Sequence, residues 1–335
     1  MDNMSKYNEI RAWRIGPARI LADLLIHWPF LTKLAHDTTS SLKLDYAKNQ
    51  QYVIEKDIHH GAFFMTNHRD IVMDSAWLSF LLEKKYGIRP FIGIGNNLFG
   101  KKWIEPFVRL NRAFVVIRDG SPRELLQRSK TLSEYIHHLR AEHKSIWLAQ
   151  REGRAKDGND LTQPAVLKML AMGSKKPFLE AIYDLNICPV CLNYEYDPCD
   201  FLKAREMQLK RDNPEWKKTK EDDLESMATG IKEWKGQVIF RLTPSINHWI
   251  NAYRAELDSM SRNEQIEAIA HQIDRQIHTN YEIFDRGTDF ETYLQQQCDK
   301  IELPNKDEQF LMEKLHEMYN NPIHNYEKSH ISGVL

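Results

Sequence analysis

The strongest constraint on the fold is an alternation of short apolar runs with longer helical patterns, which begins near residue 60. Gly, Asn, Pro or charged residues close each apolar run. The apolar runs lie at 62–66, 90–94, 113–117, 145–149, 187–193 and 237–242, and helical patterns lie at 70–86, 99–110, 122–142 and 162–172. This order predicts an α/β domain with a mostly parallel, mixed sheet flanked by helices.

The two flanks of this domain have different patterns. An amphipathic segment interrupted by prolines occupies 10–34, and helical spacing dominates from residue 246 onward. We therefore expect an N-terminal amphipathic arm at 1–45, a central α/β domain at 46–245 and a helical C-terminal extension at 246–335. The arm either lies on a membrane surface or packs on the main domain, and the sequence leaves both open.

Composition narrows the setting in which the chain works. It carries 46 Lys and Arg against 47 Asp and Glu, a net charge of -1, which provides no general attraction for nucleic acid or acidic lipid. The longest stretch without a charged residue spans 242–253, too short to cross a bilayer, which needs about 20 apolar residues. Without a recognisable secretory signal, four dispersed cysteines predict reduced thiols in a cytoplasmic protein.

The first candidate site lies where the apolar run 62–66 meets the next helix. The chain there reads Asn-His-Arg-Asp at 67–70, followed by Asp74. Asp70 is placed to cap the helix, whereas Asp74, one turn later, can reach back to His68. A carboxylate on one imidazole nitrogen makes the other nitrogen a general base. His68 with Asp74 is therefore the predicted base, Asp70 is the alternative acid, and a loop histidine beside two capping acids is the plainer interpretation.

Two further strand ends carry charged residues. Arg118 follows the run 113–117, and its planar fork suits a phosphate or a carboxylate. After the run 145–149 comes a cationic loop in which glycine lets a ligand approach the backbone: Arg151, Glu152, Gly153, Arg154 and Lys156. Together the three strand ends predict one pocket with a base and an anion site. The alternative is that Arg118 pairs with a surface acid and that the loop is solvated.

Cys188 and Cys191 have a Cys-x-x-Cys spacing, but they lie inside an apolar run at opposite parities. No second Cys or His pair accompanies them, so we expect core thiols and no metal site.

Taken in order, these segments resemble the motifs of the glycerolipid acyltransferase superfamily, which includes glycerol-3-phosphate and lysophosphatidate acyltransferases. The likeness runs from about Phe63 to Leu192. It implies transfer of a fatty acyl group from acyl-CoA or acyl-carrier protein to a glycerol-type hydroxyl, by a His/Asp base and without an acyl-enzyme. Either thioester is then a co-substrate, and no cofactor is expected.

The resemblance also implies residue roles. His68 and Asp74 supply the base, Arg118, Glu152, Gly153 and Arg154 hold the acceptor's phosphate, and Pro189 shapes the acyl or acceptor pocket. From its place in the cationic loop, Lys156 is added to the substrate-binding set.

The chain departs from the family pattern in two places. The usual first motif would place its acid at position 73, where this chain has Met73, and the usual Glu-Gly-Thr-Arg of the third motif lacks its Thr. The segments at 67–70, 151–158 and 194–198 look like a bacterial branch of peripheral members with long helical extensions.

We therefore expect an acyltransferase of phospholipid biosynthesis, peripheral on the cytoplasmic face of the inner membrane, with lysophosphatidate as the favoured acceptor. Backbone N–H groups at the helix start are expected to stabilise the oxyanion. Two alternatives stay open: a different lyso-lipid acceptor such as an aminolipid, and a non-catalytic lipid-binding relative.

Overall fold

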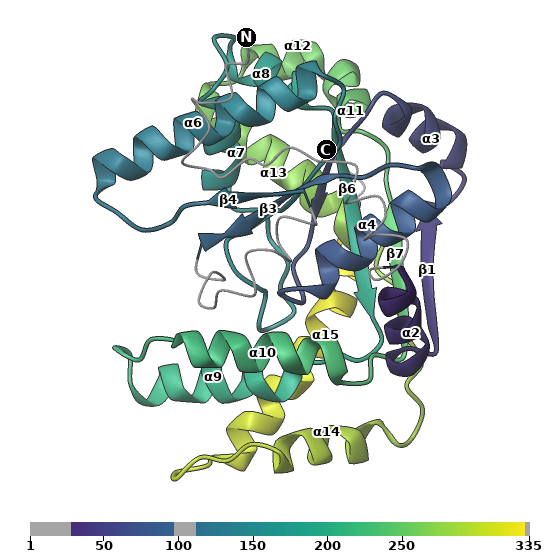
Figure 1. Cartoon of the computed structure of the whole chain (residues 1–335), viewed down its shortest axis with the longest axis vertical. Helices are drawn as coiled ribbons and strands as arrows, with labels where there is room; N and C mark the ends of the chain where they lie inside the picture. The colour runs from purple at the N-terminus through teal and green to yellow at the C-terminus, as the bar shows by residue number, and fades with distance from the viewer. Residues whose placement is uncertain (1–27, 97–111, 332–335) are drawn as a thin grey trace.

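The computed structural model describes residues 28–96 and 112–331, and within them it contains a seven-stranded sheet between helices (Figure 1). The strand order is β1-β7-β6-β2-β5-β3-β4, and β6 and β7 form the antiparallel pair in a sheet whose other pairs are parallel. The strands are β1 Ser41–Tyr46, β2 Phe63–Thr66, β3 Phe91–Gly95, β4 Ala113–Val116, β5 Ile146–Ala149, β6 Ile187–Tyr194 and β7 Gln237–Leu242. The expected α/β fold with a mostly parallel, mixed sheet is confirmed.

Helices cover both faces of the sheet because its central strands are apolar on both sides. In β2, Phe63 and Met65 join one buried cluster and Phe64 joins the other. One face carries α2 Trp28–Thr38, α3 Gln51–His59 and α4 Met73–Tyr86. The other carries α6 Pro122–Ala141, α7 Pro164–Ala171, α8 Phe178–Leu185, α11 Asn247–Ala252, α12 Arg254–Ser259 and α13 Arg262–His278. Alternating side chains thus supply two separate cores.

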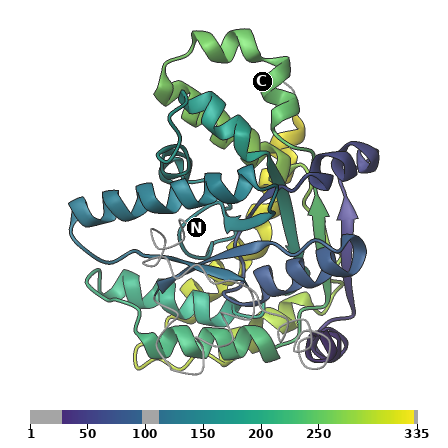
Figure 2. The same cartoon turned by 45° about the horizontal axis from the view of Figure 1, so that its top comes forward.

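The remaining helices lie mainly beyond the end of the sheet toward which β6 runs, as Figures 1 and 2 both show. They are α9 Asp200–Asp212, α10 Lys220–Lys232, α14 Phe290–Asp299 and α15 Glu308–Ile331, which continues from there to α13. Leu294, Leu311 and Leu315 form a third buried cluster there with Ala204 of α9. This helical layer therefore faces the strand ends at which the sequence predicts chemistry.

The predicted strands all appear, with ends that shift by at most one residue. The helix expected from residue 70 begins at Met73, because residues 71 and 72 form a turn. The helix expected at 99–110 lies outside the described residues. The edge strand β1 was not predicted, because Lys43 and Asp45 break its apolar run into a two-residue alternation.

The described part of the N-terminal arm packs on the main domain. The indole of Trp28 lies edge-on to Phe80 of α4 at 5.6 Å, and its Nε1 donates to Glu83 at 3.3 Å. Leu31 is buried in the core beneath it.

The C-terminal region is helical, as its spacing predicted, but its first long helix belongs to the main core. Ile266, Ile269, Ile273 and Ile277 of α13 are all buried, in the same cluster as Phe63 of β2. Within the described residues, no helix combines the length and the apolar character that crossing a membrane requires.

Candidate active site

Asn67 fixes the segment that follows β2. Its side-chain amide donates to the carbonyl of Leu192 at 3.0 Å, and its side-chain oxygen accepts from the N–H of Leu192 at 2.7 Å. The pair acts like one more rung between β2 and β6 and holds the chain where it turns out of the sheet. Carboxyl ends of parallel strands are the usual ligand sites of open α/β sheets.

His68 is hydrogen-bonded to Asp74, as the sequence favoured. Nδ1 of His68 lies 2.9 Å from Oδ2 of Asp74, and the carboxylate is fully buried while the imidazole is 15% exposed. Since an ionised carboxylate only accepts, Nδ1 carries the proton and Nε2 presents its lone pair. No hydrogen bond to Nε2 is found within the described residues, so this nitrogen is open to accept a proton.

Four donors surround the carboxylate of Asp74. Oδ2 accepts from His68, from the N–H of Arg69 at 2.7 Å and from the N–H of Asp70 at 3.0 Å. Oδ1 accepts from the hydroxyl of Tyr194 at 2.9 Å. A buried carboxylate with this many donors is fixed in place and in orientation, so it can fix the imidazole in turn.

Asp70, the alternative acid, has a different task. Its Oδ1 accepts from the N–H groups of Val72 and Met73 at 2.8 and 2.7 Å, which closes the turn before α4. Burial, and then the nearby charge of Asp74, raise the pKa of the Asp70 carboxyl. A methyl group added at Gly230 of α10 would stand 1.8 Å from Oδ2 of Asp70, so the two elements are packed closely.

Four backbone N–H groups at the helix start, where oxyanion donors were expected, already have partners. The N–H groups of Arg69, Asp70, Val72 and Met73 are all taken by the carboxylates of Asp74 and Asp70. The expectation was wrong for these four groups because the acids of this motif bond the local backbone.

The guanidinium of Arg69 belongs to a second buried network, which does not include Asp74. Its guanidinium lies 2.6 Å from Oδ2 of Asp160, which also accepts from the hydroxyl of Tyr281 at 2.6 Å and from Asn67 at 3.1 Å. The carbonyl of Asp160 contacts Nε2 of His278 at 2.7 Å. The first motif is thereby tied to the loop after β5 and to the end of α13.

The second and third motifs meet at Arg118 and Glu152. Nη1 of Arg118 lies 3.4 Å from Oε1 of Glu152, and the two side chains are 34% and 64% exposed. The N–H of Arg118 donates to the side chain of Asn96 at 3.2 Å. Arg118 therefore pairs with an exposed acid, and both side chains stay accessible to a ligand.

The loop after β5 also reaches the first motif. The N–H of Ala155 donates to the carbonyl of His68 at 3.0 Å, and the N–H of Gln150 donates to that of Thr66 at 2.8 Å. Gly153 adopts a left-handed φ of +73°, with open space where a side chain would begin. One loop thus contacts both the His68 segment and Arg118.

Arg154 and Lys156 are less open than the cationic loop suggested. Arg154 is buried, and its Nη1 has no hydrogen-bond partner within the described residues. Burial opposes its charge, but Cys199, Asp70 and other nearby acids raise its pKa overall. Lys156 forms an ion pair with Glu206 of α9, and burial lowers its pKa. Among the predicted phosphate-binding cations, Arg118 is thus the most exposed.

Pro189 and the two neighbouring cysteines lie inside β6. Pro189 pairs in register with Met65, and its carbonyl accepts from Thr243. Cys188 and Cys191 belong to the two opposite cores, and burial raises the pKa of both thiols. Burial also raises the pKa of the Cys199 thiol, to about 12, so these three thiols are poor nucleophiles near neutral pH.

Two residues at this site were missed by the sequence reasoning. Tyr194 was noted only within a motif, and Lys203 lies in a charge-rich helix that suggests solvent. The ammonium of Lys203 is 1% exposed, donates to the carbonyl of Arg69 at 3.0 Å and pairs with Asp197. The available signal was that Tyr194 ends a buried strand and Asp197 follows it closely.

The ring of Trp147 completes the surroundings of His68. It lies edge-on to the imidazole, with ring centres 6.2 Å apart, and its Nε1 donates to Thr66 at 3.2 Å. The imidazole is therefore held by a hydrogen bond on one edge and by an aromatic wall.

Comparison with known proteins adds no relative: no family model and no curated protein matches this chain. The assignment of function therefore depends on the site itself.

Proposed function

We propose that this protein is an O-acyltransferase that moves a fatty acyl group from acyl-CoA or acyl-carrier protein to a hydroxyl of a glycerol-phosphate-type acceptor, with lysophosphatidate favoured. The observation that carries the proposal is the His68–Asp74 pair at the end of β2, with Nε2 of the imidazole left open. The resemblance of the ordered motifs to glycerolipid acyltransferases supplies the reaction class.

In the proposed reaction, Nε2 of His68 takes the proton of the acceptor hydroxyl as that oxygen attacks the thioester carbonyl. The buried carboxylate of Asp74 stabilises the imidazolium that forms. When the C–S bond breaks, the proton passes from His68 to the departing thiolate, and the acyl group stays on the acceptor oxygen.

The buried thiols of this region favour a mechanism in which the substrate supplies the nucleophile over one in which a cysteine forms an acyl-enzyme. Cys188, Cys191 and Cys199 are buried, and burial raises the pKa of each thiol. In this proposal the base therefore acts on a hydroxyl that the ligand brings.

Arg118 is the proposed contact for the acceptor's phosphate. Its fork lies 3.4 Å from Glu152 and remains one-third exposed, at a strand end of the same sheet edge. Three strand spacings, about 14 Å in all, separate the ends of β2 and β4. The loop after β5 spans this interval and contacts both the His68 segment and Arg118.

The long acyl chain requires access to a membrane surface, so we place the protein as a peripheral protein on the cytoplasmic face of the inner membrane. Flotation of the full chain with liposomes of anionic phospholipid tests this placement. The chain should float with the liposomes, and recovery only in the dense fraction would remove the membrane part of the proposal.

The decisive assay measures thiol release from a long-chain acyl-CoA with a panel of acceptors: lysophosphatidate, glycerol 3-phosphate, a lyso-aminolipid and no acceptor. Thiol release that depends on a lyso-lipid supports the proposal, and the acceptor that gives it defines the substrate. Acyl-CoA binding without thiol release under any condition, repeated with acyl-carrier protein, would instead favour a lipid-binding relative that has lost turnover.

A further inference from the structure

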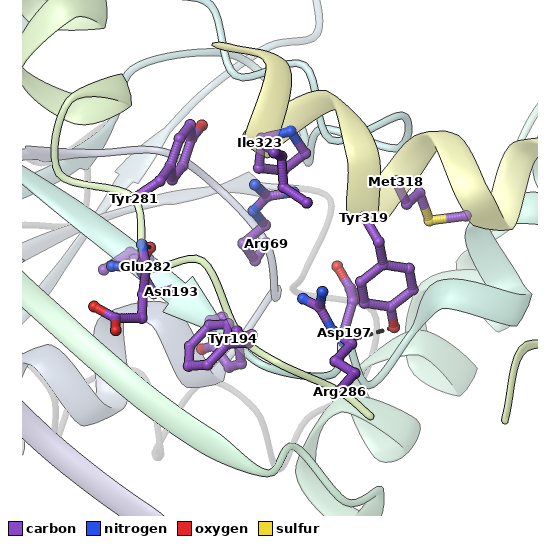
Figure 3. A pocket seen from close by; sticks show the side chains of 13 residues that line it. Arg69, Asn193, Tyr194, Asp197, Tyr281, Glu282, Arg286, Met318, Tyr319 and Ile323 are labelled. Carbon is purple, nitrogen blue, oxygen red and sulfur yellow. Dashed lines mark hydrogen bonds between the residues drawn. The ribbon is translucent and has the colours of Figure 1, made fainter. Parts of the chain in front are cut away.

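A cavity of about 40 Å³ lies between the end of β6, the segment that follows α13, and α15 (Figure 3). By comparison, a single buried water needs roughly 10–15 Å³. Its wall includes two arginines, two acids and two tyrosines that matter below: Arg69, Arg286, Asp197, Glu282, Tyr194 and Tyr319. The cavity therefore has room for about three waters, or for one small polyatomic ion.

Three of the four charges in this wall already have counter-charges. Arg69 pairs with Asp160 at 2.6 Å. Asp197 pairs with Lys203, and Glu282 pairs with Arg241 at 2.5 Å. These pairs leave the guanidinium of Arg286 as the charge to be explained.

Arg286 has no carboxylate within ion-pair distance among the described residues. Its Nε donates to the carbonyl of Glu195 at 2.8 Å, while the carboxylate of Glu195 accepts from the N–H of Gln237. Burial lowers the pKa of Arg286 because nearby tyrosines and Glu195 compensate only in part. Arg286 is half-buried, and a cation that has lost part of its solvation without gaining a counter-charge marks a place where an anion is expected.

Aromatic rings hold this guanidinium without using its terminal nitrogens. Its carbon lies 4.7 Å from the ring centre of Tyr319 and 5.1 Å from that of Phe290. Figure 3 shows the side chain rising from its loop into the space between Tyr319, Tyr194 and Arg69. The terminal nitrogens are therefore fixed in direction and free to donate to a ligand.

We propose that this cavity binds a phosphate group, to which the terminal nitrogens of Arg286 donate hydrogen bonds. A tetrahedral oxyanion matches the arginine fork and the volume, and its charge supplies the missing counter-charge. The phosphate is either the free ion or the head of a phosphomonoester. Tyr194 forms part of this wall while its hydroxyl bonds Asp74, so the cavity adjoins the His68 site but is built from other residues.

Isothermal titration calorimetry, with inorganic phosphate titrated into the full-length protein, tests the proposal. Chloride salt keeps the ionic strength constant. The wild type should bind one phosphate saturably, and Arg286→Gln should weaken the affinity by about tenfold or more. Absence of saturable binding by the wild type, or equal affinity in the variant, would overturn the proposal.

Arg211→Gln is the matched control. Arg211 also stacks on an aromatic ring, 4.2 Å from the ring centre of Phe310, but it is already paired with Asp212 and Asp307. The Arg211→Gln variant should bind phosphate with the affinity of the wild type. An equal loss in both variants would show a general charge effect and contradict a site at Arg286.

A second variant covers the case in which Arg286→Gln does not fold, as judged by circular dichroism. Arg286→Lys keeps the charge and the aromatic contact but removes the fork, so the affinity for phosphate should fall at least threefold. Wild-type affinity in this variant would contradict the role of the fork.

Competition experiments distinguish the two sources of the phosphate. Competition by glycerol 3-phosphate, but not by glycerol, would identify a phosphomonoester site. Competition by neither compound would identify a site for the free ion. No outcome depends on acyl transfer, so this proposal and the proposed function can fail separately.

Discussion

The hydroxyl of Tyr194, at the end of β6, donates a 2.9 Å hydrogen bond to Oδ1 of Asp74, on the side of the carboxylate opposite His68. The tyrosine is buried, and its ring stacks on Trp77 at 6.4 Å. Because Asp74 receives His68 on one oxygen and Tyr194 on the other, the tyrosine sets the direction from which the imidazole is held.

Tyr194→Phe should therefore lower kcat for acyl transfer by about tenfold while KM for the acceptor stays near the wild-type value. A hydrogen bond to a charged group is worth about 1.5–3 kcal/mol, which sets that scale. Steady-state kinetics with the acceptor varied gives both constants. A rise in KM with kcat unchanged would show that Tyr194 contacts substrate and does not position the base.

Tyr293→Phe is the control for a purely structural loss. Tyr293 is also largely buried and donates to a buried carboxylate, that of Asp200, at 2.7 Å, but in the helical layer. Both variants should unfold at a lower denaturant concentration than the wild type, and only Tyr194→Phe should have a lower kcat. Equal kinetic losses would make the Tyr194 effect one of stability alone.

Asp160→Asn tests the buried network behind the first motif. The substitution leaves the buried guanidinium of Arg69 without its carboxylate, so the free energy of unfolding should fall by about 3–5 kcal/mol. Equilibrium unfolding in urea measures the change. Glu225→Gln, which breaks a partly exposed pair with Arg205, should cost less than about 1 kcal/mol. Similar costs for the two substitutions would contradict the network's structural role.

Asp274 predicts a pH dependence of stability. Burial raises the pKa of its carboxyl to about 7, against an ordinary value of 3.8, although it accepts two bonds from Thr162. Between pH 4 and 7 the folded state therefore holds a proton that the unfolded state has lost, so stability falls as pH rises through this window.

Asp274→Asn removes this contribution, because an amide keeps the acceptor oxygen and does not titrate. Urea unfolding at pH 5, 6, 7 and 8 should show the wild type losing stability relative to the variant up to about pH 7. Asp212→Asn, at an exposed carboxyl whose pKa is lowered by Arg211, should follow the wild type. Parallel curves for wild type and Asp274→Asn would contradict the assignment.

Much of the fold could be predicted because its core strands are continuous apolar runs. Ile187–Tyr194 is buried at every position and stands out in the sequence. Ser41–Tyr46 was missed because an edge strand, with one face toward solvent, needs only the alternation of Leu42, Leu44 and Tyr46. A strand that is buried on both faces is therefore easier to recognise in the sequence than a strand that is buried on one face.

The site divides in the same way between local and distant contacts. The pairing of His68 with Asp74 and the capping by Asp70 were predictable, because each pair of partners lies within six positions of one another at the start of a helix. Lys203 reaches Arg69 across 134 positions, from a helix rich in charged residues. Which charged residue turns inward depends on tertiary packing, and a single sequence does not contain that information.

The most direct test of the central claim is the rate of acyl transfer from a radiolabelled long-chain acyl-CoA to lysophosphatidate by His68→Ala. Loss of the general base should lower the rate by roughly 10²–10⁴-fold while the circular dichroism spectrum stays that of the wild type. His248→Ala removes a histidine from another His–Asp pair, with Asp57 at 2.8 Å, and should leave the rate unchanged. Wild-type turnover by folded His68→Ala protein would contradict the account.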